Sequence, residues 1–94
     1  MVINCFRTSE TARLFERQRS HRLPPEVHRR AYKKLLILDA AEQLEDLRTP
    51  PGNRLEKLVG KRVGQYSIRV NDQWRICFRW EAGQAFEVEP CDCH

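Results

Sequence analysis

The first half of the chain repeats its apolar residues at helical spacing. Thr8 is suited to cap a helix that we expect to run to about Arg19. Pro24-Pro25 opens a second helix, because proline is tolerated at the first helical position. Apolar residues then recur four, four and three positions apart on one face of this second helix, at Val27, Ala31, Leu35 and Leu38. The pattern therefore predicts two helices, the second with a clear apolar face.

Shorter patterns flank these helices. Val2 to Phe6 alternates weakly between apolar and polar residues, which predicts a short strand. Asp39 and Glu42 fit a capping box for a short further helical turn that contains two leucines. Pro50-Pro51-Gly52 then breaks the helical pattern.

After this break the apolar pattern takes a period of two, which is typical of strands. We expect strands over 55–58, 65–70, 73–80 and 84–89, with a glycine-containing loop after the first. The inward positions of the last three are Tyr66, Ile68, Val70, Trp74, Ile76, Phe78, Trp80, Phe86 and Val88. The pattern predicts an antiparallel meander whose apolar face is covered by the two helices. The predicted fold class is α+β, in the order one strand, two helices and four strands.

The parity of the inward positions predicts the register of the sheet. Val70 and Trp74 both point inward, so the residues between them form a three-residue loop. This register sets Arg69 opposite Arg75, on one face with Ser67, Cys77 and Arg79. A similar loop at 81–83 places Glu89 beside Arg75 and brings the C-terminal residues to the same end of the sheet. Pro90 fits an edge strand, because it has no N–H to donate.

Basic charge is concentrated in one stretch of the chain, although the net charge is only +4. Residues 48–79 hold eight Lys or Arg against two Asp or Glu, and residues 80–94 hold four Asp or Glu and no Lys or Arg. Arg69 and Arg75 repel each other unless an anion lies near them. Glu87 and Glu89 are one candidate for that anion, and an RNA phosphate is the other. A basic face that only meets solvent remains an alternative.

Composition and cysteine usage exclude several classes of protein. A chain of 94 residues is expected to form one domain, residues 1–94. No apolar run approaches the ~20 residues of a membrane span, and the start of the chain does not resemble a signal peptide, so we expect a cytoplasmic protein with reduced thiols. Cys91-x-Cys93-His94 resembles a fragment of a zinc site, but Cys5 and Cys77 lie far off in sequence. We therefore expect no metal and no cofactor.

Three segments together resemble one protein family. They are LLILDAAEQLEDLRTPPGNRLEKLVG at 35–60, GQYSIRVNDQWRICFRW at 64–80 and EVEPCDCH at 87–94. With the N-terminal elements, the chain resembles the HigB toxins of the RelE/ParE superfamily over nearly its whole length. The resemblance implies a RelE-like α+β fold with two helices on an antiparallel-rich sheet. It also implies a ribosome-dependent endoribonuclease that acts on mRNA in the decoding site.

The resemblance also implies partners and site residues. The expected partner is a HigA-like antitoxin with a helix-turn-helix domain, and operator DNA is contacted only through the antitoxin complex. Arg75 matches the strand arginine of the family, and Asp92 and His94 match its terminal D-x-H. Three positions depart from the family pattern: Glu56 stands where histidine is frequent, Val59 where lysine is frequent, and Cys93 where tyrosine is usual. No catalytic role is assigned to these three.

The predicted mechanism is attack of an RNA 2′-hydroxyl on the adjacent phosphate without a metal ion. The protein must then supply a base, an acid and positive charge for the phosphorane. Arg75 suits the positive charge, and His94 suits acid or base with Asp92 orienting it. The residues expected to position the RNA backbone are Lys57, Lys61, Arg62 and Arg69. A second proton-transfer group is not evident. Glu56 is a candidate only because a carboxylate can accept a proton.

Two other functions fit the same fold. A ParE-like toxin inhibits DNA gyrase without nuclease chemistry, and the basic sheet face together with Asp92 and His94 argues against it. A weakened or non-catalytic member binds RNA or antitoxin only, and the departures at Glu56, Val59 and Cys93 favour this second alternative.

Overall fold

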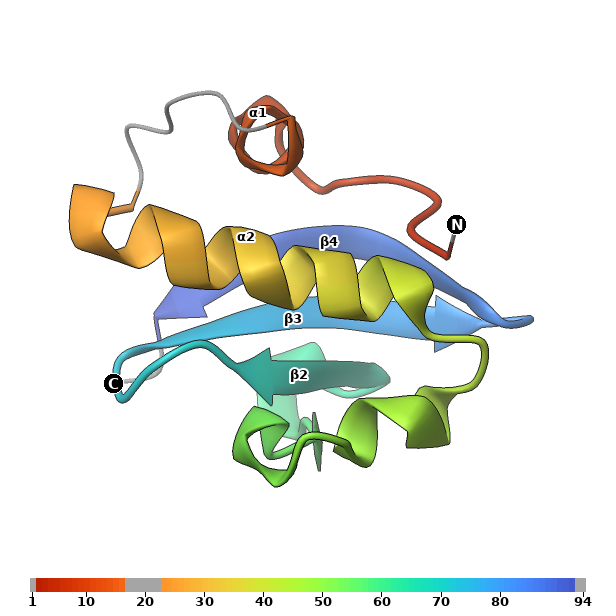
Figure 1. Cartoon of the computed structure of the whole chain (residues 1–94). Coiled ribbons are helices and arrows are strands. Elements are labelled where there is room, and N and C mark those ends of the chain that lie inside the picture. The colour runs from red at the N-terminus through yellow and green to blue at the C-terminus, as the bar shows by residue number, and fades with distance from the viewer. Residues whose placement is uncertain (1, 17–22, 93–94) are drawn as a thin grey trace.

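A computed structural model describes residues 2–16 and 23–92 and shows an α+β fold, as predicted (Figure 1). Its helices are α1 (Ser9–Phe15) and α2 (Pro25–Ala40), and its strands are β1 (Glu56–Lys57), β2 (Gln65–Arg69), β3 (Trp74–Glu81) and β4 (Gln84–Asp92). Short 3-10 turns lie at Leu44–Arg48, Pro51–Asn53 and Gly60–Arg62. The strands form one antiparallel sheet in the order β1-β2-β3-β4, and α2 lies across one face of it.

The helices begin where the sequence predicts. The hydroxyl of Thr8 accepts a hydrogen bond of 3.2 Å from the N–H of Thr11 and caps α1. This helix ends at Phe15, and Arg19, the expected end, lies outside the described residues. The four predicted apolar residues of α2 are all buried: Val27, Ala31, Leu35 and Leu38. They pack in one core with Ile68, Ile76 and Phe78 of the sheet, which are fully buried.

The N-terminal segment forms less regular structure than predicted. In place of a strand, two isolated parallel bridges join Ile3 to Ala85 and Phe6 to Val88 on β4. One carboxylate oxygen of Asp39 accepts hydrogen bonds of 3.0 Å from the N–H groups of both Val2 and Ile3. The last turn of α2 is therefore tied to the start of the chain.

This placement of Asp39 makes the predicted capping box wrong. The short turn at Leu44–Arg48 does form, but Gln43 and Asp46 make its capping box. Asp39 still belongs to α2, which ends one residue later, so its carboxylate faces the N-terminal segment and not the following turn. Glu42 is exposed, and its backbone N–H donates to Asp46.

The register between β2 and β3 is confirmed. Arg69 lies opposite Arg75, and Ser67 lies opposite Cys77. Pro90 lies in β4, which is an edge strand of the sheet, as expected for a residue without an N–H. The face of the sheet away from α2, called the outer face below, therefore carries both opposed arginines.

The register between β3 and β4 differs from the prediction. Ala82 and Gly83 form a two-residue hairpin loop, both with positive φ, where three loop residues were expected. An irregularity between Cys77 and Arg79 then shifts the pairing once more. Glu89 consequently lies opposite Cys77, and Cys91 occupies the place opposite Arg75.

The same irregularity changes which residues of β4 point inward. Glu87 has φ of 53°, a value typical of a β-bulge and one that alternation cannot predict. Val88 is fully buried, but Phe86 pairs with Arg79 and lies beneath its guanidinium, with the Cζ atom 5.7 Å from the ring centroid. The prediction that Phe86 and Val88 share one face is therefore wrong.

Asp39→Ala should lower the free energy of unfolding by about 1–3 kcal/mol, because two backbone N–H groups lose a charged acceptor. Urea denaturation followed by circular dichroism measures the change. Glu42→Ala is the matched control and should shift stability by less than about 0.5 kcal/mol, since the backbone N–H of Glu42 keeps its acceptor. Equal losses in the two variants would contradict this assignment.

Candidate active site

Arg75 is the most firmly held basic side chain of the outer face. Its Nε donates to the hydroxyl of Ser67 at 2.6 Å. Its Nη2 donates to the backbone carbonyl of Arg54 and, at 3.3 Å, to that of Ser67. Only 12% of the side chain is exposed, so the guanidinium is fixed in one orientation. A fixed, largely desolvated fork can bind an anion without further ordering.

The two opposed arginines find different partners, and neither is one that the sequence suggested. Arg69 forms an ion pair with Asp72 in the β2–β3 loop. Arg75 has the carboxylate of Glu56 at 3.9 Å from Nη2, and that carboxylate is 59% exposed. Glu87 and Glu89 pair elsewhere. The contact with Glu56 is long and solvated, so it compensates the charge of Arg75 only weakly.

A left-handed residue supplies one of the groups that hold Arg75. Arg54 has φ of 44° and follows the turn at Pro51–Asn53. Its carbonyl accepts from Arg75, although its own side chain is exposed. Sequence reasoning missed this contact, because it depends on a backbone conformation rather than on a side-chain type. The Pro-Pro-Gly-Asn run that precedes Arg54 signals only that a turn is present.

The C-terminal candidates are only partly described. Asp92 pairs with Trp74, one position along from the pair of Arg75 and Cys91. Because side chains alternate, Asp92 lies on the face of Trp74 and not on that of Arg75. It accepts a hydrogen bond of 3.1 Å from the side chain of Gln73. Cys93 and His94 lie outside the described residues.

The predicted RNA contacts from the loop region are exposed but not gathered at Arg75. Lys57 pairs with Tyr66, so it belongs to the opposite face of the sheet, and its neighbour Glu56 shares the face of Arg75. Lys61 lies in the turn at Gly60–Arg62 and is exposed, as are the two valines beside this turn. Lys57 is therefore not on the same face of the sheet as Arg75.

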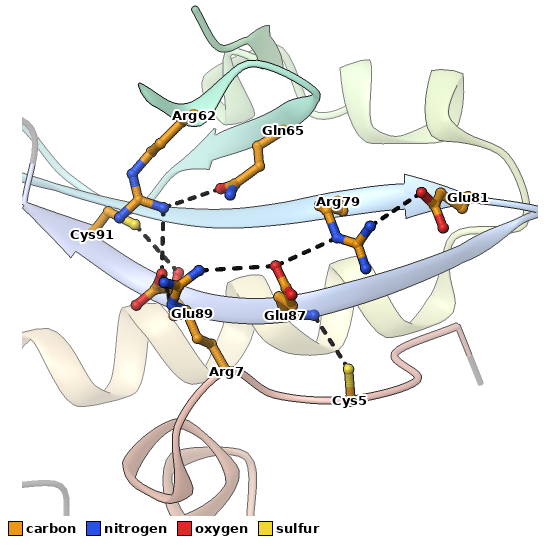
Figure 2. Close-up of polar contacts among 9 residues, drawn as sticks. All are labelled: Cys5, Arg7, Arg62, Gln65, Arg79, Glu81, Glu87, Glu89 and Cys91. Atoms are coloured by element: carbon orange, nitrogen blue, oxygen red, sulfur yellow. Dashed lines mark hydrogen bonds and ion pairs between the residues drawn. The ribbon is translucent and has the colours of Figure 1, made fainter. Parts of the chain in front are cut away.

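Arg62 and Arg79 belong to a chain of ion pairs on the outer face (Figure 2). The buried carboxylate of Glu89 lies 3.3 Å from Arg62 and 3.3 Å from Arg7. Glu87 lies 3.9 Å from Arg7 and 3.4 Å from Arg79, which also contacts Glu81. We call this chain the outer ion-pair network; its members are Arg7, Arg62, Arg79, Glu81, Glu87 and Glu89. It joins the N-terminal segment and the Gly60–Arg62 turn to β3 and β4.

The outer ion-pair network favours the charged form of Arg62. Burial opposes the charged form, but the neighbouring groups of Cys91, Cys77 and Glu89 outweigh it and raise the pKa of Arg62. Arg62 also donates to Gln65 at 3.0 Å. Its observed contacts are therefore structural, and a role in RNA binding would require it to serve both purposes.

Within residues 2–16 and 23–92, no three His, Cys, Asp or Glu side chains gather where they could hold a metal ion. No disulfide joins Cys5, Cys77 and Cys91 to one another. No described helix is both long and apolar enough to cross a membrane.

Comparisons with known proteins cover the segments that build this site. A family model described as a RelE-like toxin of the type II toxin–antitoxin system HigB matches residues 4–94. The chain is 44% identical over 84 residues to "Toxin HigB-1" of Vibrio cholerae, with 88% of each chain covered. It is 36% identical over 77 residues to an uncharacterized protein of Haemophilus influenzae, with 81% of this chain and 76% of the relative covered. It is 29% identical over 93 residues to "Endoribonuclease HigB" of Proteus vulgaris, with 99% and 100% covered.

Glu89→Gln should lower the free energy of unfolding by about 1–3 kcal/mol, because two arginines lose a buried anionic partner. Glu87→Gln makes the same chemical change at a side chain that is 41% exposed, and should cost less than about 1 kcal/mol. Urea denaturation at low and at high salt measures the free energy of unfolding of both variants. Equal, small effects would mean that the outer ion-pair network contributes nothing to stability.

Proposed function

Because the chain belongs to the HigB-like family of RelE-like toxins from type II toxin–antitoxin systems, we propose that it is an endoribonuclease that cuts messenger RNA on the ribosome. As a toxin of such a system, it has an antitoxin partner. The observation that carries the nuclease proposal is the fixed guanidinium of Arg75 on the outer face. The Proteus vulgaris relative, named an endoribonuclease, supports the same activity.

Arg75 stabilises the charge that develops on the phosphate. Its Nε and Nη2 are bound to Ser67 and Arg54, which leaves Nη1 without a hydrogen-bond acceptor among the described residues. A phosphate oxygen can bind to Nη1, beside the exposed carboxylate of Glu56 near Nη2. Since the guanidinium is already oriented, little reorganisation is needed when the pentacovalent phosphorane forms.

The reaction is attack of the 2′-oxygen on the adjacent phosphorus. The new O–P bond closes a 2′,3′-cyclic phosphate, and the bond to the 5′-oxygen breaks. A base takes the proton of the 2′-hydroxyl, and an acid gives a proton to the departing 5′-oxygen. With both proton transfers and the positive charge supplied by protein groups, this step needs no metal ion.

His94 and Glu56 are the proposed proton-transfer groups. Glu56 places its carboxylate 3.9 Å from Nη2 of Arg75, close to where the phosphate binds, and it suits the base. The match of Asp92 and His94 to the terminal D-x-H of the family supports His94 as the acid. We assign the acid to His94, and Asp92, which lies on the face of Trp74, acts only by orienting His94. Arg69, Lys57, Lys61 and Arg62 guide the RNA backbone.

The setting follows from the same proposal. The chain acts as a single toxin domain in the cytoplasm and meets its mRNA in the decoding site of the ribosome. Its antitoxin is a HigA-like protein with a helix-turn-helix domain, and operator DNA is reached only through the complex with that protein. The ribosome supplies part of the substrate positioning, which accounts for a catalytic site with few groups.

Arg75→Ala should reduce mRNA cleavage by about 10²–10³-fold, because the phosphorane loses its main positive charge. The matched control is Arg79→Ala, which removes an arginine from the same strand and face but one committed to Glu81 and Glu87. Primer extension on a reporter mRNA in a purified translation system measures the cuts.

A variant that lacks His94 should also lose activity, by about 10²–10⁴-fold in the same assay, because the departing 5′-oxygen loses its acid.

Each result decides between the candidate functions. Cuts that need ribosomes and vanish in Arg75→Ala but persist in Arg79→Ala support the nuclease site. Unchanged cleavage by Arg75→Ala contradicts the assignment of Arg75. If the folded wild-type protein makes no cuts, the nuclease proposal is wrong. Gyrase inhibition would then appear as DNA damage after expression, and a non-catalytic member would bind ribosomes or antitoxin without arresting growth.

A further inference from the structure

The turn at Pro51–Asn53 is contacted by basic side chains from two layers of the molecule. Asn53 accepts a hydrogen bond from the ammonium of Lys34, which comes from α2. The next residue, Arg54, gives its carbonyl to Arg75 of β3, on the outer face. The turn also packs against β2. It therefore forms a rim between the helix layer and the outer face, with one cation on each side.

The orientation of Asn53 follows from its other hydrogen bonds. The side chain is fully buried, and its Nδ2 donates to the carbonyls of Leu47 at 3.2 Å and Thr49 at 3.3 Å. With both amide hydrogens engaged, only the carbonyl oxygen is left to face Lys34. Asn53 thus presents one oriented acceptor to the Lys34 ammonium.

The surroundings of Lys34 favour an incoming anion. Lys34 is half-buried, and its described hydrogen-bond partner is a neutral amide. Within the described residues no carboxylate forms an ion pair with Lys34, whereas each arginine of the outer ion-pair network has one. Burial, and then the charges of Arg30 and Arg69, lower the pKa of Lys34. An RNA phosphate would relieve this repulsion, as a carboxylate does for the arginines.

We propose that Lys34 is a further RNA-contacting residue of the toxin and that Asn53 positions it. The Lys34 ammonium binds a backbone phosphate next to the one held by Arg75, on the other side of the rim formed by the turn. This proposal rests on the proposed function, because it extends the binding site for the same substrate. It gives the PPGNRL segment at 50–55 a role: the segment supplies one acceptor to Lys34 and one to Arg75, and so orients both cations for one RNA strand.

Lys34 could instead serve only to hold Asn53 in the fold. One substitution distinguishes this structural role from a role in RNA binding. Lys34→Gln keeps an N–H donor for Asn53 but removes the charge. Lys33→Gln makes the same change at the preceding, exposed position of α2 and is the matched control. Lys34→Arg keeps the charge and tests for rescue. Thermal unfolding of all three variants shows that the fold is retained.

The binding experiment uses ribosomes programmed with an mRNA whose decoding-site 2′-hydroxyls are methylated, which blocks the attack but leaves the phosphates. Lys34→Gln should weaken binding about tenfold at low salt and reduce the slope of log affinity against log salt by about 0.7–1. Lys33→Gln should bind within about twofold of the wild type, and Lys34→Arg should restore most of the slope. Ribosomes without mRNA serve as a second control and should bind Lys34→Gln and wild type equally.

The outcomes separate this proposal from the proposed function. If the wild type cuts mRNA and Lys34→Gln keeps both the wild-type affinity and the wild-type salt slope, the role of Lys34 is overturned and the nuclease stands. Equal weakening with and without mRNA also overturns it, because the contact is then made to the ribosome. If the wild type makes no cuts but Lys34→Gln loses affinity only on programmed ribosomes, the nuclease fails and the RNA contact stands.

Discussion

Repulsion between two arginines that face each other across β2 and β3 is the constraint on which the site depends. The fold relieves it without placing a buried carboxylate between them. Arg69 turns to Asp72 in the adjoining loop, and Arg75 is held by a hydroxyl and two carbonyls. These neutral acceptors orient the guanidinium, and the long, solvated contact with Glu56 compensates its charge only weakly.

The outer face is divided into a compensated part and an uncompensated part. Around Glu89, the outer ion-pair network matches each described arginine with a carboxylate and ties the start of the chain to β4. Toward the β2–β3 loop, Arg75 is held mainly by uncharged groups. Fully paired arginines and a weakly paired arginine thus lie at different places along one face of the sheet.

The features that the sequence predicted are those with a strict period. Side chains alternate along a strand, so the inward positions of Val70 and Trp74 were enough to set Arg69 opposite Arg75. The two-residue loop at Ala82 and Gly83 and the bulge at Glu87 each shifted the pairing by one residue, which is why Glu89 was expected beside Arg75 and is found opposite Cys77. The carbonyl of Arg54 and the amide of Asn53 were missed because backbone conformation and hydrogen bonds between distant segments leave no periodic signal. His94 lies beyond the described residues, and its role stays a prediction.

The central claim is that protein groups around Arg75 promote attack of a 2′-hydroxyl on the adjacent phosphate. The most direct test is the chemistry of the ends that cleavage leaves on the mRNA. Mass spectrometry of a cut short mRNA recovered from programmed ribosomes should show a 2′,3′-cyclic phosphate on the upstream fragment and a 5′-hydroxyl on the downstream one. A 3′-hydroxyl paired with a 5′-phosphate would mean that water attacked the phosphate, and it would contradict the account.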